Sequence, residues 1–143
     1  MTDTFKLGFV CVQNAGRSQM ATAFAERERT HRGLEDHVEI ITGGTHPAES
    51  VHEVVVEIMN ERGIDLSDRT PREVSAEELD ACDVVATMGC STLELDADVE
   101  VHDWALDDPD GAEIDEARRI RDTIQGLVEE LFDEVEASLE ESA

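Results

Sequence analysis

Short apolar runs alternate along the chain with segments whose apolar residues recur at helical spacing. Four runs have the length and composition of buried strands, at residues 5–12, 38–42, 83–88 and 101–104. After the first run, a helix is predicted from Ser18, and Gly33 is expected to end it. Its apolar face consists of Met20, Ala21, Phe24 and Ala25.

Three later segments also carry helix signals. An amphipathic stripe ending at Gly63 contains Val51, Val54, Val55, Ile58 and Met59. Ser75 and Glu78 have the spacing of a capping box at the start of a short helix. A final helix is predicted over 112–138, with an inward stripe formed by Ala117, Ile120, Ile124, Val128, Leu131 and Val135.

Strands that alternate with helices imply parallel pairing through right-handed crossovers. We therefore predict an α/β three-layer sandwich with a four-stranded parallel open sheet, in the order 2-1-3-4, and helices on both faces. At 143 residues, the chain is expected to form one domain over residues 1–143. Ligands of such sheets bind outside the carboxyl ends of the strands, so functional residues are expected at that edge.

The chain is strongly acidic, with 11 Lys plus Arg against 36 Asp plus Glu and a net charge of −25. This balance argues against nucleic acid as a partner. The carboxylates are spread along the chain, so we interpret them as the solvating surface of a halophilic protein rather than an interaction surface. Molar salt shortens the Debye length to about 3 Å, so the repulsion between these carboxylates is tolerable in a salt-rich cytoplasm. Without a signal peptide or an apolar run of ~20 residues, we expect a cytoplasmic protein and no membrane partner.

Three cysteines without paired spacing, Cys11, Cys82 and Cys90, predict free or reactive thiols rather than a disulfide framework. Cys82 precedes the third predicted strand and Cys90 follows it, and a strand of that length separates them by about 20 Å. We therefore assign Cys82 to the structure. The sequence predicts no metal site and no cofactor, because no metal-ligand spacing relates the cysteines to the five histidines, His31, His37, His46, His52 and His102.

Cys11 ends the first predicted strand, and the helix that follows directs its free N–H groups toward the same edge. These donors, the helix dipole and Arg17 predict a cradle for a tetrahedral oxyanion around a thiolate. Ser18 is a further donor to the sulfur. The alternative is a buried Cys11 that serves only as a small hydrophobic residue, with Arg17 as a surface cation, because a Cys-x5-Arg match also occurs by chance.

Two later residues belong to the same predicted edge. Cys90 follows the third strand, so it is within reach of Cys11 after some loop movement if strands one and three are neighbours. Asp108 follows the fourth strand and precedes Pro109, which holds it extended, and a carboxylate near an anion suits a general acid. Asp107 is the second choice for this acid, and an ordinary acidic turn remains the alternative.

Five segments together resemble the low-molecular-weight protein tyrosine phosphatase superfamily and, within it, the arsenate reductases. These are "CVQNAGRSQMA", "TGGTHP", "ERGIDLSDRTPREV", "DVVATMGC" and "WALDDPDG". The resemblance implies a low-molecular-weight phosphatase-like fold and a phosphate-binding loop that consists of Cys11, Val12, Gln13, Asn14, Ala15, Gly16, Arg17 and Ser18. It further implies Cys11 as nucleophile, Asn14 as a brace, Arg17 as the oxyanion clamp, Ser18 as thiolate stabiliser and Asp108 as general acid.

Two features favour the reductase branch. Phosphatases of this fold usually flank the pocket with aromatic rings, but 43–52 contains no aromatic residue and the chain has no tyrosine. Cys90 matches the second cysteine of the reductases. Thioredoxin-coupled members often carry a third, relaying cysteine, which "STLELDADVE" after Cys90 lacks. The resemblance thus implies thioredoxin or a small-molecule thiol as the reductant and leaves the choice open.

Arsenate reduction through a Cys11–Cys90 disulfide is accordingly the leading hypothesis. The second is hydrolysis of phosphomonoesters through a cysteinyl-phosphate, which uses Cys11, Arg17 and Asp108 but not Cys90. The third is a non-catalytic module that binds oxyanions or senses redox state.

Overall fold

The computed structural model describes residues 4–88, 99–104, 106, 109 and 111–141. Its elements in chain order are β1 (Phe5–Cys11), α1 (Arg17–His31), β2 (Val38–Gly44), α2 (Glu53–Asn60), α3 (Ala76–Asp80), β3 (Val84–Met88), β4 (Glu100–Asp103) and α4 (Ile114–Glu141). Each strand and helix predicted from the sequence is present.

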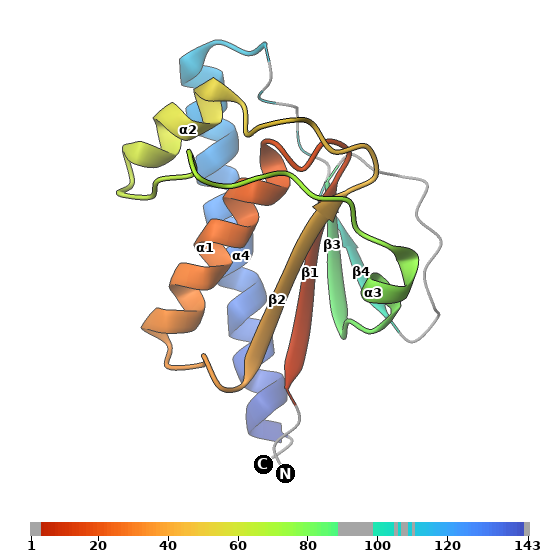
Figure 1. The fold of residues 1–143 in the computed structure, drawn as a ribbon. Coiled ribbons are helices and arrows are strands. Elements are labelled where there is room, and N and C mark those ends of the chain that lie inside the picture. Colours follow the sequence, from red (N-terminus) through yellow and green to blue (C-terminus); the bar gives the residue numbers. More distant parts are fainter. Residues whose placement is uncertain (1–3, 89–98, 105, 107–108, 110, 142–143) are drawn as a thin grey trace.

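The four strands form one parallel sheet in the order β2-β1-β3-β4, which confirms the predicted topology (Figure 1). β1 is a central strand, and its last residue, Cys11, pairs with Gly44 at the end of β2 and with Met88 at the end of β3. Three strand ends therefore meet at one edge of the sheet, and the first strand-to-helix turn starts at this edge.

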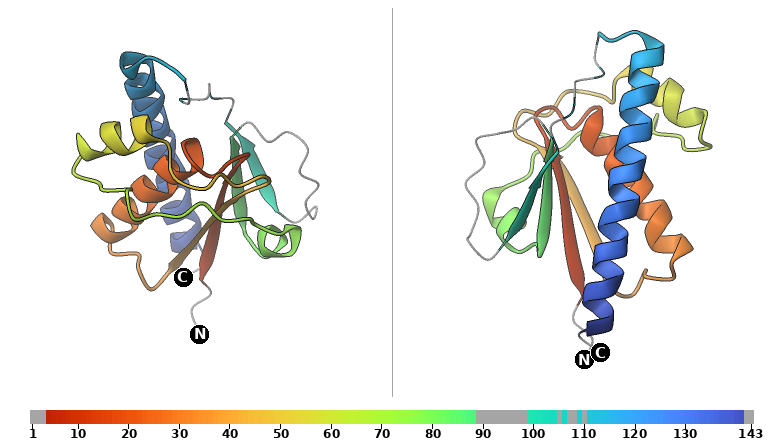
Figure 2. Two further views of the ribbon diagram at one scale, coloured as in Figure 1. Left: turned by 45° about the horizontal axis from the view of Figure 1, so that its top comes forward. Right: turned by 180° about the vertical axis from the view of Figure 1, so that it is seen from behind.

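Helices cover both faces of the sheet, as predicted, but unequally. α1, α2 and α4 lie on one face, whereas α3 covers the other (Figures 1 and 2). A small second cluster lies under α3 and contains the buried residues Val10, Val74, Leu79, Cys82, Val85 and Val99. The larger core, on the α1 and α4 side, therefore supports the loop that follows β1.

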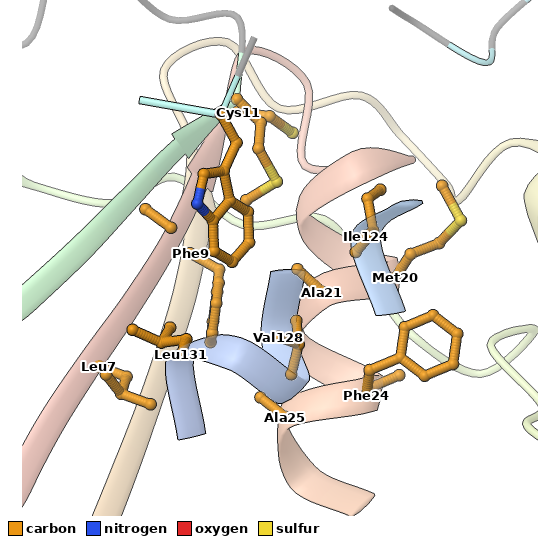
Figure 3. Close-up of a cluster of buried hydrophobic side chains, with 14 of the residues drawn as sticks. Leu7, Phe9, Cys11, Met20, Ala21, Phe24, Ala25, Ile124, Val128 and Leu131 are labelled. Atoms are coloured by element: carbon orange, nitrogen blue, oxygen red, sulfur yellow. The ribbon is translucent and has the colours of Figure 1, made fainter. Parts of the chain in front are cut away.

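The larger core lies between β1, α1 and α4 (Figure 3). Leu7 and Phe9 point from β1 toward this layer, and the predicted helical stripes of α1 and α4 are buried against them. The ring centroids of Phe9 and Trp104 are 6.1 Å apart, so the chain leaving β4 packs beside β1. The core thus holds β1 and the exit from β4 in a common frame directly below the functional edge.

The ends of the elements differ from prediction by a few residues. β1 ends at Cys11 and not at residue 12, because the Val12 carbonyl leaves the sheet and accepts a hydrogen bond from the His46 N–H at 2.7 Å. α1 starts at Arg17, one residue before the predicted start. Gly33 and Gly63 have φ of 66° and 75°, a backbone that favours glycine and fits their expected role as helix stops.

The predicted cap of α3 is confirmed: the Ser75 hydroxyl accepts a hydrogen bond from the Glu78 N–H at 3.2 Å. The final helix runs over Ile114–Glu141, shifted toward the C-terminus from 112–138. Over the ranges that the structure describes, no helix is long and apolar enough to cross a membrane.

Candidate active site

The turn between β1 and α1 surrounds a pocket of about 200 Å³ at the carboxyl edge of the sheet. Its lining consists of Cys11, Val12, Gln13, Gly16, Arg17 and His52. Five of these six residues belong to the segment 11–18 that the sequence singled out, and the sixth precedes α2. A pocket of this size is smaller than the roughly 300–1,000 Å³ typical of sites for larger organic ligands.

The Cys11 thiol lies at the base of this turn and is 2% exposed. Its Sγ is 2.8 Å from the Ser18 hydroxyl oxygen and accepts a hydrogen bond from the Asn14 N–H at 3.2 Å. The structure thus brings Cys11 and Ser18 together as predicted. Hydrogen bonds donated to sulfur stabilise negative charge there, which suits a nucleophilic thiolate.

Asn14 is the centre of the hydrogen bonds that shape the turn. It is fully buried and has a φ of 51°, a left-handed backbone that is uncommon for residues other than glycine. Its Nδ2 donates to Ser18 Oγ at 2.7 Å and to Thr42 Oγ1 at 3.0 Å. Its Oδ1 accepts from Gln19 Nε2 and from the Arg72 N–H, both at 3.1 Å. Asn14 therefore links the turn to α1, to β2 and to the chain before α3.

The segment after β2 holds the turn from outside through backbone hydrogen bonds. The carbonyls of Cys11, Val12, Gln13 and Ala15 accept from the N–H groups of Thr45, His46, Ala48 and His52, respectively, at 2.7–3.3 Å. Because the C=O and N–H groups of a trans peptide point in opposite directions, outward carbonyls turn the following N–H groups inward. The Asn14 N–H, which points to the Cys11 sulfur, is the direct example.

Gly44 permits this close approach between β2 and the turn. A Cβ on Gly44 would lie 2.5 Å from the Val12 carbonyl oxygen and 3.0 Å from the Asn14 backbone nitrogen. Both are backbone atoms, so no side-chain movement relieves the clash. The glycine in "TGG" thus has a steric reason that the sequence pattern alone did not reveal.

Arg17 is the first residue of α1 and lines the pocket. Its Nη1 donates to the Leu106 carbonyl at 2.9 Å, so the same guanidinium contacts the chain that follows β4. The first turn of α1 carries no acidic residue. The positive end of the helix and the guanidinium therefore act on the pocket together, and both favour an anion.

Cys90, Asp107 and Asp108 lie outside the described residues, so their predicted places at the edge remain predictions. Described residues next to them in the chain lie near this edge of the sheet. Met88, at the end of β3, pairs with Cys11. Pro109 lies close enough to the turn that a Cβ on Gly16 would be 3.2 Å from the proline Cγ.

Cys82 lies in the second core cluster, away from the pocket. It is 4% exposed, and its thiol lies 3.6 Å from the Glu78 carbonyl. Burial raises the pKa of Cys82 to about 11, so the thiol is neutral at physiological pH. These observations agree with the structural role expected for Cys82.

Thr42, Gln19 and His52 are neighbours of the turn that were not predicted from the sequence. Thr42 passes the Asn14 hydrogen bond on to the Phe9 carbonyl, to which it donates at 3.0 Å. The available signal for His52 was its position directly before the stripe of α2. Within the described ranges, no group of three or more His, Cys, Asp or Glu side chains is arranged to hold a metal ion.

Comparison with known proteins agrees with this geometry. The low molecular weight phosphotyrosine protein phosphatase family matches residues 6–141. The chain belongs to this family.

A curated protein of Halobacterium salinarum, named "Putative arsenate reductase", is 72% identical over 132 residues, which cover 92% of this chain and 93% of that protein. A solved thioredoxin-dependent arsenate reductase from Corynebacterium glutamicum has a TM-score of 0.78 and 32% identity. That match covers 95% of this chain and 64% of the other, so this chain spans less than two thirds of that protein. A structure described as an arsenate reductase in the phosphate binding state has a TM-score of 0.72 and 27% identity, covering 92% of this chain and 98% of that one.

Proposed function

We propose that this protein is an arsenate reductase that converts arsenate to arsenite through Cys11. The observation that carries the proposal is the buried Cys11 sulfur, which accepts a hydrogen bond from the Asn14 N–H and lies 2.8 Å from the Ser18 hydroxyl oxygen, in a small pocket that Arg17 also lines. Similarity to proteins named arsenate reductases supports arsenate as the substrate. The reaction is proposed to take place within one domain, residues 1–143, in the cytoplasm, where thiols are kept reduced.

In the first step, the Cys11 thiolate attacks arsenic and displaces one oxygen ligand. The inward N–H groups that follow the four outward carbonyls, those of residues 12, 13, 14 and 16, and the Arg17 guanidinium stabilise the charged oxygens of arsenate. Asp108 is our choice for the acid that protonates the departing hydroxide. Its position before Pro109 supports this choice, because Pro109 packs near Gly16.

In the second step, the Cys90 thiolate attacks the Cys11 sulfur. The S–S bond forms, the S–As bond breaks, and its electron pair reduces arsenic(V) to arsenite. The two electrons come from the two thiols, so each turnover leaves a Cys11–Cys90 disulfide. Support for Cys90 is the pairing of Met88 with Cys11, which brings the end of β3 to the nucleophile.

Thioredoxin or a small-molecule thiol is proposed to reduce this disulfide. One structural neighbour is described as thioredoxin-dependent, and a relative from Synechocystis, 31% identical, is named a glutaredoxin arsenate reductase. These names favour a thioredoxin and a glutaredoxin, respectively, as the electron donor.

The test is arsenite production from arsenate with each reductant, repeated with Cys90→Ser and Cys11→Ser. We expect both variants to lose multiple turnover. Full thiol-dependent arsenite production by Cys90→Ser would exclude the second step.

A phosphatase activity is the second candidate, favoured by the family match itself. It predicts hydrolysis of aryl phosphates that survives Cys90→Ser and is lost with Cys11→Ser. Arsenate and phosphate are tetrahedral anions of similar size, so one pocket accepts both. Both activities are therefore measured on the same preparations.

A further inference from the structure

Gln13 and His52 meet at the pocket although 39 positions separate them. His52 Nε2 lies 3.0 Å from Gln13 Oε1, and because an amide oxygen only accepts, the ring nitrogen donates. Both residues line the pocket. We call these two residues the rim pair.

Two hydrogen bonds, one from the ring and one from the backbone N–H, hold His52 beside the turn. Its Nε2 is held by Gln13, and its Cδ2 would lie 3.7 Å from a Cβ placed on Gly16. The backbone N–H of His52 donates to the Ala15 carbonyl at 3.0 Å. The ring therefore stands beside residues 13–16. Gln13 is exposed whereas Cys11 is buried, so the rim pair forms a wall on the solvent side of the pocket.

The rim pair is relevant to the reaction because of the direction in which the leaving group points. Attack by the buried Cys11 sulfur displaces the ligand on the far side of the central atom, which points away from the sulfur and toward solvent. For arsenate this ligand is a hydroxyl or oxide. For an aryl phosphate it is an ester oxygen with an apolar ring attached.

A polar wall treats these two leaving groups differently. A hydroxyl forms hydrogen bonds with an imidazole or an amide. An aromatic ring removes water from both polar groups and forms no hydrogen bond that replaces it. A site with polar groups placed for a hydroxyl rejects analogues that lack it far more strongly than an apolar pocket rejects a misfit.

We propose that Gln13 and His52 determine specificity, by favouring a bare tetrahedral oxyanion over an aryl phosphomonoester. The inference rests on the proposed function for its biological meaning. The binding preference itself can be measured without turnover.

The test measures the dissociation constants of inorganic phosphate and of phenylphosphonate by calorimetry on the reduced full chain. Neither ligand is turned over. For Gln13→Ala and His52→Ala, the ratio of the phenylphosphonate constant to the phosphate constant is expected to fall about tenfold from its wild-type value. The double variant is expected to fall little further, because either change breaks the same pair.

Two controls separate the rim pair from other effects. His46→Ala removes an exposed histidine of the same segment that does not line the pocket, and it is expected to keep the wild-type ratio. His52→Phe keeps a ring of similar size without its polar atoms, and it is expected to lose at least as much discrimination as His52→Ala.

An unchanged ratio in the two alanine variants would overturn the proposal, as would a wild-type ratio in His52→Phe, which would assign the effect to bulk. Circular dichroism of each variant confirms folding. Absence of arsenite production by the wild type would reject the proposed function alone, because the binding ratio is measured without it.

Discussion

Asn14 combines a strained backbone with four side-chain hydrogen bonds, and these two contributions can be separated by substitution. Asn14→Ala removes the side-chain partners of Ser18, Thr42, Gln19 and the Arg72 N–H and keeps a side chain at a φ of 51°. Buried groups left without partners and a left-handed alanine together are expected to lower the free energy of unfolding by about 3 kcal/mol. Urea unfolding measures this loss.

Asn14→Gly is the matched variant, because glycine accepts the left-handed backbone. It is expected to be about 1 kcal/mol more stable than Asn14→Ala while it loses the same hydrogen bonds. Arsenite production is expected to fall about 100-fold in both, since the Asn14 N–H that contacts Cys11 moves with the turn. Equal stability of the two variants would contradict the assigned strain.

Arg17 lines the pocket and also donates to the Leu106 carbonyl, and a lysine does not reproduce both roles. A planar guanidinium presents several donors in a fixed fork, whereas an ammonium is a point charge. Arg17→Lys is therefore expected to lower kcat/KM for arsenate about 100-fold or more. Steady-state kinetics check this, with Arg119→Lys on an exposed turn of α4 as the control that keeps wild-type values.

At the scale of elements, α2 is fastened to α4 by Arg121. Its guanidinium is nearly buried, donates to the Ile58 carbonyl at 2.9 Å and pairs with Glu61 at 2.7 Å. Arg121→Met is expected to destabilise the protein by about 2–3 kcal/mol, because a buried carbonyl and a carboxylate lose a charged donor.

Arg62→Met is the comparison for this anchor. Arg62 also pairs across to α4, with Asp122 at 2.6 Å, but its side chain is 40% exposed. An exposed pair contributes about 0–1 kcal/mol. Chemical unfolding that gave equal losses for Arg62→Met and Arg121→Met would refute a special role for the buried guanidinium.

Cys82 under α3 makes the stability depend on alkaline pH. Burial disfavours the thiolate, so the folded pKa of about 11 lies above the ordinary 9.0 and the folded state holds the proton longer than the unfolded state. Its contribution is complete below pH 9 and is lost as pH rises toward 11.

The measurement compares the free energy of unfolding at pH 7 and pH 10.5 in Cys11→Ser and in Cys11→Ser/Cys82→Ala. The alkaline loss is expected to be smaller by about 1–2 kcal/mol in the double variant. Identical losses would show that Cys82 does not carry this dependence.

The elements differ in how far the sequence predicted them. α4 and α2 follow from apolar periodicity, and β1 and β3 from short apolar runs, because these patterns record burial directly. The place of Cys11 followed from the rule for parallel sheets. The ends of elements were shifted, since they depend on caps and on backbone hydrogen bonds made elsewhere.

The contacts that form the walls of the site could not be predicted from the sequence, for a physical reason. The contacts of Gln13 with His52 and of Asn14 with Thr42 join residues 39 and 28 positions apart. No local pattern records such meetings, which depend on how the chain leaves β2. The hydrogen bonds from residues 45–52 to the turn join backbone atoms, so they do not depend on which side chains these residues carry.

At the scale of the whole molecule, the net charge of −25 opposes both folding and the approach of an anionic substrate. Ion pairs within the described chain place arginines against these carboxylates, as at Arg32, which contacts Glu28, Asp133 and Glu136. Eleven basic residues cannot balance thirty-six acidic ones. Similarity to a protein of the halophile Halobacterium salinarum agrees with the expectation of a salt-rich environment.

The melting temperature is therefore expected to rise by about 10 °C between 0.1 M and 2 M KCl, as the Debye length falls from about 10 Å to below 3 Å. A general effect of salt on apolar burial would raise it too, so charge must be varied separately. The exposed residues Glu130, Glu134 and Glu140 form no ion pair with the described part of the chain, and their replacement by Gln reduces the net charge from −25 to −22 with little change in shape. If repulsion is the cause, this triple variant melts higher than the wild type in 0.1 M KCl and gains less from added salt, because less repulsion remains to be screened. Parallel salt curves for the two proteins would instead assign the stabilisation to apolar burial and leave the acidic surface without a role in it.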